Sequence, residues 1–270
     1  MSATELYKQG LLSDAIQAQV DEVKDAPTDH NLRIFLFELL VFAGDLERAR
    51  KHLDLVMYED PDQQLAVVQY KQLIDTELER RKVFAGDATP TFLAEIPTHS
   101  ELRLKAIAAL KQSNTDEAVQ LLEQAQQATP VIKATLNGKA VELVQDCDDV
   151  LGTNLEVMFK GQYCWVPLEQ VATLRMNPPK TPRDLIWFPA RLDTQDDSSG
   201  EVFLPVLYID SHVQDDEKIR LGQATEFTES TPIRGYGSRL FLAGDDGISL
   251  LEWREIDVEP NEPAEEKSDQ

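Results

Sequence analysis

The sequence predicts a multidomain chain of the α plus α+β class, in which an α-α superhelix of short repeats precedes an α+β domain rich in antiparallel strands. Two observations lead to this prediction. Small residues, alanines and prolines recur in a fixed pattern over residues 1–130, and aromatic and β-branched runs punctuated by Pro and Gly fill much of the remainder. With 270 residues, of which 42% are hydrophobic, the chain is long enough for two folded units.

The repeat occurs in three segments, residues 10–27, 44–61 and 113–130. Each starts with Gly or Ser, has Ala five positions later and Pro twelve positions after that. The first two copies lie 34 residues apart, which is the period of tetratricopeptide (TPR) repeats. In such a repeat the small residue forms the turn between two antiparallel helices, the Ala allows close helix crossing, and the Pro ends the second helix. We therefore predict a TPR-like helical repeat domain over residues 1–130.

The repeat pattern is incomplete, because Glu22 and Phe37 stand where it places small residues. These departures predict a loosened, irregular superhelix, and a helical bundle with similar turns is the alternative. Between the second and third copies, apolar residues at helical spacing predict one long amphipathic helix that begins after Pro61 and ends at Gly86. The following loop, residues 87–100, is expected to be an insertion without regular structure because it contains two prolines.

The second domain is expected over residues 131–255, with several short antiparallel strands. The strand candidates are residues 163–168, 184–192, 201–209 and 248–253. Each of the first three contains a proline, which cannot donate to a sheet, so these strands should be edges or bent at bulges. The prolines are Pro167, Pro189 and Pro205.

A hairpin turn and a disordered C-terminal tail are also predicted for this half of the chain. The GDDG segment at residues 244–247 is typical of a hairpin turn, with Asp246 and Gly247 at positive φ. Residues 256–270 are poor in apolar side chains and strongly acidic, which predicts a disordered tail.

The composition excludes several classes of function. The chain has 26 Lys and Arg against 49 Asp and Glu, a net charge of -23, and no basic cluster stands out, so neither nucleic acid nor an anionic membrane is an expected partner. The sequence has neither a signal-peptide pattern nor a membrane-length apolar run, and its two cysteines form no CxxC motif. These features predict a cytoplasmic protein that does not insert into membranes.

The sequence offers little for catalysis or for a cofactor. The four histidines are scattered, with none at ligand spacing from a Cys or carboxylate. The acidic group Asp146, Asp148 and Asp149 could present oxygen ligands to a hard cation, but turn formation is the favoured interpretation. The RGYGSR segment, residues 234–239, lacks the remaining features of a phosphate-binding loop. We predict no catalytic residue, no metal site and no cofactor.

Partner binding is the function that a superhelix of repeats favours, because its concave surface suits a helix or an extended peptide. The repeat register places eight residues toward such a groove. They are Asn31, Ile34, Glu38, Val41, Phe42, Leu65, Val68 and Gln72. Core packing explains the apolar members of this set equally well. If they do line a groove, the expected partner is an amphipathic helix, either basic or neutral.

Several segments together resemble the ImpE/SciE family, also called TagJ, whose members are accessory components of type VI secretion clusters. The most specific are KGQYCWVPLEQV at 160–171 and RDLIWFPA at 183–190, joined by IRLGQATEF at 219–227 and RGYGSRLF at 234–241. The resemblance covers nearly the whole chain to about Trp253. Cys164 stands where the family often has an aromatic residue before the Trp.

The resemblance implies a cytoplasmic, non-enzymatic adaptor. Its partners would be a helix of the small subunit of the contractile sheath and the AAA+ ATPase that disassembles contracted sheaths. The family supplies no active-site residue to place on this sequence. Two alternatives stay open: a metal-dependent enzyme in the second domain, and an acidic chaperone for a basic secreted cargo.

Overall fold

The first half of the chain is helical, as predicted. A computed structural model describes residues 1–260 and shows seven helices before the first strand. They are α1 Ala3–Lys8, α2 Leu12–Asp25, α3 His30–Phe42, α4 Leu46–Asp54, α5 Pro61–Phe84, α6 Thr98–Lys111 and α7 Thr115–Ala128. Aspartates cap α3, α4 and α5 by accepting a backbone N–H near the start of each helix. The predicted long helix is thus confirmed as α5, and it ends two residues before Gly86.

The three repeat segments fold into helical hairpins: α1 with α2, α3 with α4, and α6 with α7. The small residue of each segment occupies the turn at positive φ: Gly10 at 81°, Gly44 at 77° and Ser113 at 60°. The three repeated alanines, Ala15, Ala49 and Ala118, are completely buried. The turn chemistry and the close helix contact were therefore predicted correctly.

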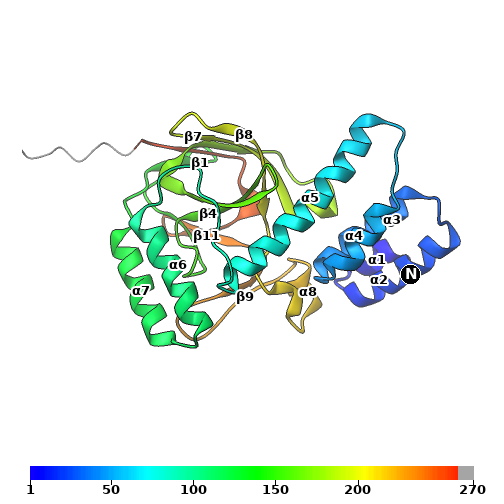
Figure 1. The fold of residues 1–270 in the computed structure, drawn as a ribbon, viewed down its shortest axis with the longest axis horizontal. Coiled ribbons are helices and arrows are strands. Elements are labelled where there is room, and N and C mark those ends of the chain that lie inside the picture. Colours follow the sequence, from blue (N-terminus) through cyan, green and yellow to red (C-terminus); the bar gives the residue numbers. More distant parts are fainter. Residues whose placement is uncertain (261–270) are drawn as a thin grey trace, which may run out of the picture.

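The prediction that the repeat proline ends the second helix is wrong for the second repeat. Pro61 does not end α4, which stops at Asp54; it is the first residue of α5, where a missing N–H costs no helical hydrogen bond. The arrangement of the hairpins also departs from one continuous superhelix. Helices α1 to α5 pack in succession, whereas the α6–α7 hairpin lies on the far side of the strand-rich half (Figure 1).

The second half is rich in antiparallel strands, which confirms the predicted α+β class. The strands are β1 Ala134–Leu136, β2 Lys139–Val141, β3 Val144–Asp146, β4 Asn154–Phe159, β5 Gln162–Pro167, β6 Val171–Met176, β7 Trp187–Thr194, β8 Ser199–Pro205, β9 Thr225–Phe227, β10 Gly235–Gly237, β11 Leu240–Ala243, β12 Asp246–Ser249 and β13 Glu255–Val258. Eight of them form one curved sheet in the order β2-β1-β13-β6-β7-β8-β4-β5, and β12-β11-β3 and β10-β9 form smaller sheets (Figure 1). The short helix α8, Glu217–Arg220, and four 3-10 turns connect them.

The proline prediction holds for one strand only. Pro167 ends β5, which is an edge strand of the large sheet, but β7 and β8 lie in the sheet interior. Pro189 is tolerated in β7 because β6 pairs with β7 only as far as Met176 and Ala190, so no hydrogen bond from position 189 is needed on that side. Pro205 is the last residue of β8.

The end of the domain and one turn also differ from expectation. The predicted tail begins too early, because residues 256–258 belong to β13, which pairs with both β1 and β6. Residues 261–270 of that tail lie outside the described residues. The GDDG segment does make the β11–β12 hairpin, but the residue at positive φ is Gly244, at 65°.

Hydrophobic clusters join the two halves of the chain. One cluster fills the concave side of the large sheet. A second joins α1 to α5 with Met158, Trp187 and Leu221 of the strand-rich half. A third joins the α6–α7 hairpin with Val150, Trp165 and others. The predicted boundary at residues 130 and 131 falls between α7 and β1, and the division into separate domains stays a prediction.

Candidate partner-binding sites

The eight residues predicted to line a groove divide by their burial. Glu38, Val41 and Phe42 are buried, at 4%, 6% and 1% exposure, and Ile34 is half-buried. The others, Asn31, Leu65, Val68 and Gln72, are exposed. A partner can therefore contact the second group directly, whereas Val41 and Phe42 belong to the cluster that packs α3 against its neighbours.

Glu38 is a contact between the two halves of the chain. Its Oε1 lies 3.1 Å from Nη1 of Arg183, and the Arg183 guanidinium stacks 4.7 Å above the ring centre of Tyr70 on α5. Burial raises the pKa of Glu38 to about 7, against the opposing effect of Arg183. This side chain holds α3 to the segment that precedes β7.

An apolar stripe on α5 is formed by Leu65 and Val68, with Gln72 one turn further along. These positions are spaced i, i+3 and i+7, so they share one face of the helix. Leu65 is 65% exposed and Val68 is 44% exposed, and nothing in the described part of the chain covers them. Three acidic residues, Glu59, Asp60 and Asp62, surround the start of the same helix. The stripe therefore presents apolar surface beside negative charge, which suits an amphipathic helix with basic flanks.

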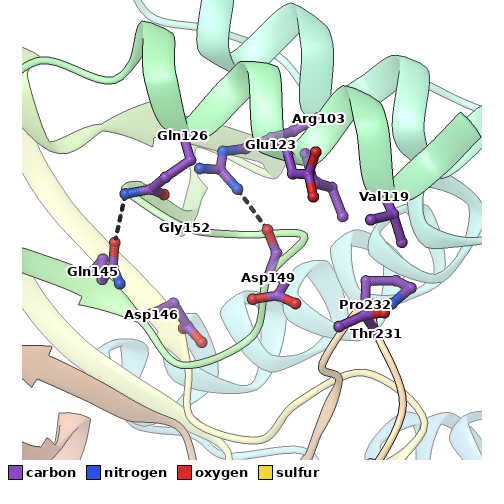
Figure 2. A pocket seen from close by; sticks show the side chains of 11 residues that line it. Arg103, Val119, Glu123, Gln126, Gln145, Asp146, Asp149, Gly152, Thr231 and Pro232 are labelled. Atoms are coloured by element: carbon purple, nitrogen blue, oxygen red, sulfur yellow. Dashed lines mark hydrogen bonds between the residues drawn. The ribbon is translucent and has the colours of Figure 1, made fainter.

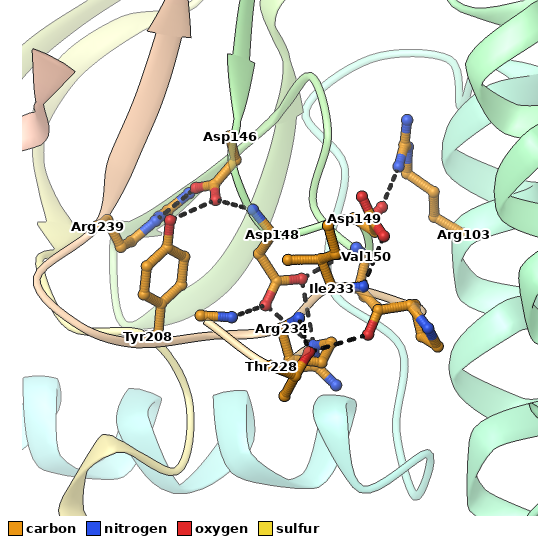
Figure 3. Close-up of polar contacts among 12 residues, drawn as sticks. Arg103, Asp146, Asp148, Asp149, Val150, Tyr208, Thr228, Ile233, Arg234 and Arg239 are labelled. Carbon is orange, nitrogen blue, oxygen red and sulfur yellow. Dashed lines mark hydrogen bonds and ion pairs between the residues drawn. The ribbon is translucent and has the colours of Figure 1, made fainter. Parts of the chain in front are cut away.

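A buried ionic network lies where α5 meets the sheets. Arg80 of α5 donates from Nε to Glu156 Oε1 at 2.6 Å and from Nη2 to Oε2 at 3.1 Å. Arg239 bridges Glu156, at 3.1 Å, and Asp146, at 2.6 Å. Figure 3 shows Arg239 and Tyr208 beside Asp146, where the Tyr208 hydroxyl donates to the other Asp146 oxygen at 2.9 Å. Burial opposes ionisation of Glu156, but Arg80 and Arg239 outweigh it and lower its pKa. These charges pair with one another in the interior and are closed to a partner.

The acidic group predicted to form a turn does so, and also makes long-range contacts. Asp148 accepts the N–H of Val150 at 2.9 Å, as an Asp in a turn does. It also pairs with Arg234 Nε at 2.9 Å, while Asp149 accepts the N–H of Ile233 at 2.6 Å (Figure 3). Among residues 1–260, no group of three or more His, Cys, Asp or Glu side chains could hold a metal ion. The carboxylates of Asp146, Asp148 and Asp149 instead accept hydrogen bonds from backbone N–H groups and from arginine side chains.

A cavity of about 410 Å³ opens between the α6–α7 hairpin and the loop that carries these aspartates. Its walls include Val119, Leu122 and Glu123 of α7, Asp149, Pro232 and the buried Arg103 of α6. Figure 2 shows the Arg103 guanidinium between the side chains of Gln126 and Glu123. Its volume lies within the usual range for ligand pockets.

Comparison with known proteins assigns the family. Residues 138–257 match the model of the ImpE protein family. Over 263 residues, covering 97% of this chain and 92% of the relative, the sequence is 34% identical to the type VI secretion system accessory component TagJ of Pseudomonas aeruginosa. This chain belongs to the ImpE family. The resemblance noted from the sequence motifs is confirmed.

A crystal structure of a protein from Vibrio parahaemolyticus has the same fold as this ImpE-family chain. The two superpose with a TM-score of 0.86 over 95% of this chain and 97% of the other, at 22% sequence identity. In this ImpE-family member, no helix of residues 1–260 is both long and apolar enough to cross a membrane.

Arg80, Glu156 and Arg239 were missed from the sequence. Their partners lie 76 and 93 positions away along the chain, so no local spacing connects them. The buried position of Arg103, in contrast, could have been predicted from the sequence. It lies three and four positions before the buried Ala106 and Ile107 of α6, and is therefore on the buried face of that helix. A single Arg on an otherwise apolar helix face indicates a guanidinium that needs hydrogen-bond partners inside the protein.

Proposed function

We propose that this protein is a non-enzymatic, cytoplasmic adaptor of a type VI secretion system. It links the small subunit of the contractile sheath to the AAA+ ATPase that disassembles the sheath. The observation that carries the proposal is the 34% identity, over 97% of the chain, to an accessory component of such a system. The buried ion pairs, which leave the acidic groups structural, are consistent with a role that needs no catalytic group.

The apolar stripe on α5 is the proposed binding site for the sheath subunit. Its exposed apolar members are Leu65 and Val68, and Gln72 continues the same face of α5, while Asn31 is exposed on α3. Full burial of a Leu or Val side chain contributes roughly 1.5–3 kcal/mol, so covering the 65% of Leu65 and 44% of Val68 that remain exposed contributes roughly 0.7–2 kcal/mol each. The net charge of -23 favours a partner helix with basic residues beside its apolar face.

The test is the affinity of the purified protein for the purified sheath small subunit, measured by calorimetry. Leu65→Glu with Val68→Glu should weaken binding at least tenfold, because it places charge on the apolar stripe. Leu78→Glu is the matched control. Leu78 is 43% exposed on the same helix, but at 100° per residue it faces a different side from Leu65.

Two outcomes count against this site. Equal affinity of the double variant and the wild type would remove the stripe from the interface. Equal loss in the Leu78→Glu control would show that the effect is not specific to the stripe. Failure of the wild-type protein to bind either the sheath subunit or the ATPase would reject the adaptor function itself.

A further inference from the structure

Arg103 is a buried cation with incomplete hydrogen bonding. The residue is 2% exposed, and its Nη1 donates to the main-chain oxygen of Asp149 at 2.5 Å. Within residues 1–260, neither Nε nor Nη2 has a hydrogen-bond partner. Burial lowers the pKa of Arg103 to about 10, so the guanidinium still carries its charge at neutral pH. A buried charged donor without partners is costly, because its hydration has been lost without replacement.

The local backbone is adapted to this side chain. Gly152 lies against the guanidinium, and a Cβ atom at this position would lie 2.2 Å from both Cζ and Nη2 of Arg103. Gly152 is also at positive φ, 53°, so glycine is required there on two grounds. The absence of a side chain at Gly152 thus leaves room for the Arg103 guanidinium at the wall of the 410 Å³ cavity.

The remaining walls indicate which kind of ligand would fit. Val119, Leu122 and Pro232 supply apolar surface, and the amides of the exposed Gln126 and the half-buried Gln145 can pair with peptide groups. The Gln126 amide is held only by a 3.4 Å contact to Gln145, so it is free to move aside (Figure 2). The carboxylates of Glu123, Asp146 and Asp149 would repel a phosphate or another multivalent anion. A single carboxylate on an otherwise neutral or cationic body meets less repulsion, because it carries one negative charge.

We propose that this cavity binds a peptide segment of a protein partner through a carboxylate that pairs with Arg103. Arg is suited to this task because its planar head group can grip a carboxylate with two parallel hydrogen bonds. Gln126 swings aside to admit the carboxylate, and a basic residue next to it in the peptide meets Glu123. The site lies on α6 and α7, on the other side of the molecule from the α5 stripe, and does not depend on the adaptor function (Figure 1).

Three short peptides test the proposal by NMR titration of the full-length protein. Acetyl-Leu-Lys-Leu with a free C-terminal carboxylate presents a chain terminus, and acetyl-Lys-Glu-Leu-amide presents a side-chain carboxylate. Acetyl-Leu-Lys-Leu-amide has neither. At least one of the first two should bind at least tenfold more tightly than the third and should shift the amide signals of Gly152 and Gln126. The tighter of the two identifies the source of the carboxylate.

Two variants test the guanidinium and the cavity independently. Arg103→Gln should abolish the preference for the carboxylate peptides. Val119→Trp fills the cavity from α7 without removing Arg103, and should block binding even if Arg103→Gln does not fold. Equal binding of acid and amide peptides overturns the proposal, as does the absence of binding by all three. Unchanged carboxylate binding by folded Val119→Trp protein does so as well.

Discussion

Arg80 and Glu156 form a doubly hydrogen-bonded ion pair that fastens helix α5 to strand β4, with both side chains almost completely buried. Removing one partner leaves the other charge without compensation in the interior, which typically costs about 3–5 kcal/mol. Arg80→Met should therefore lower the free energy of unfolding by that amount in urea denaturation. Glu156 would retain Arg239 at 3.1 Å, so a value near the lower limit is expected.

The matched control for this prediction is an exposed ion pair. Lys51 and Glu47 lie 2.6 Å apart on α4, and both side chains are more than half exposed. Lys51→Met should change the free energy of unfolding by less than about 1 kcal/mol. Equal effects of the two substitutions would mean that burial of the Arg80 pair contributes nothing beyond a surface contact.

Glu38 predicts a pH dependence of stability. Its pKa is raised in the folded protein, from 4.5 to about 7, so the folded state holds this proton more tightly than the unfolded state does. The resulting stabilisation, up to ~3 kcal/mol, is fully present below pH 4.5 and is lost as the pH rises through 7. Glu38→Gln cannot titrate, so the stability difference between wild type and variant should change over this interval.

The measurement is urea unfolding of both proteins at several pH values between 4 and 8. Asp146 also titrates in this range, since burial raises its pKa to about 6, but it does so in both proteins and cancels in the difference. A difference that stays constant with pH would show that Glu38 keeps its ordinary pKa in the folded protein.

Gly44 and Gly138 form a matched pair for testing a close contact. Both are at positive φ, 77° and 81°. A Cβ atom on Gly44 would lie 2.1 Å from the His212 ring, whereas one on Gly138 would have no atom within 4 Å. Gly138→Ala should cost only about 1 kcal/mol for the backbone conformation. Gly44→Ala should cost at least ~1 kcal/mol more, because the ring must move.

Thermal unfolding of the two alanine variants measures this difference directly. A Gly44→Ala protein no less stable than Gly138→Ala would indicate that the α3–α4 turn and the His212 segment separate easily. In that case the helical half would be held to the sheets mainly by the hydrophobic cluster around Trp187 and by the Arg80 and Glu38 contacts.

Salt dependence separates an adaptor from an acidic chaperone. If the apolar stripe of Leu65 and Val68 carries the binding, affinity for the sheath subunit should fall less than tenfold between 0.05 and 0.5 M salt, because apolar contacts are not screened. Binding that collapses over this range would instead support electrostatic capture of a basic cargo. Calorimetry at both salt concentrations, with the wild type and with the double variant Leu65→Glu with Val68→Glu, distinguishes the two modes of binding.

The parts of the fold that depend on local chemistry could be predicted from the sequence. Gly10 and Gly44 mark turns because glycine adopts positive φ at little cost, whereas Ser113 adopts it against the usual preference of a residue with a Cβ atom. The alanine five positions later is small enough for close helix packing. Pro61 shows the limit of such reasoning. Proline is as suitable at the start of a helix as after its end, and the sequence alone favoured the wrong choice.

The polar interior could not be predicted, because its partners are brought together only by the folded sheet. Asp146 and Arg239 are 93 residues apart and meet because β3 pairs with β11. Likewise, the predicted groove mixed buried Phe42 with exposed Leu65, since helical spacing gives a face but not the element that covers it. The family motifs identified the relatives, whereas the burial of each residue required the structure.

Thr91 gives the segment between α5 and α6 a structural role. Its N–H and C=O pair with Tyr163 and Trp165, so this loop runs along the outer edge of β5 as a further row of main-chain hydrogen bonds. A loop in that place shields the sheet from pairing with other molecules. A truncated protein that began within residues 92–97 would lack Thr91, would expose that edge of β5 and would be prone to self-association, so a fragment of the strand-rich half should begin before this loop.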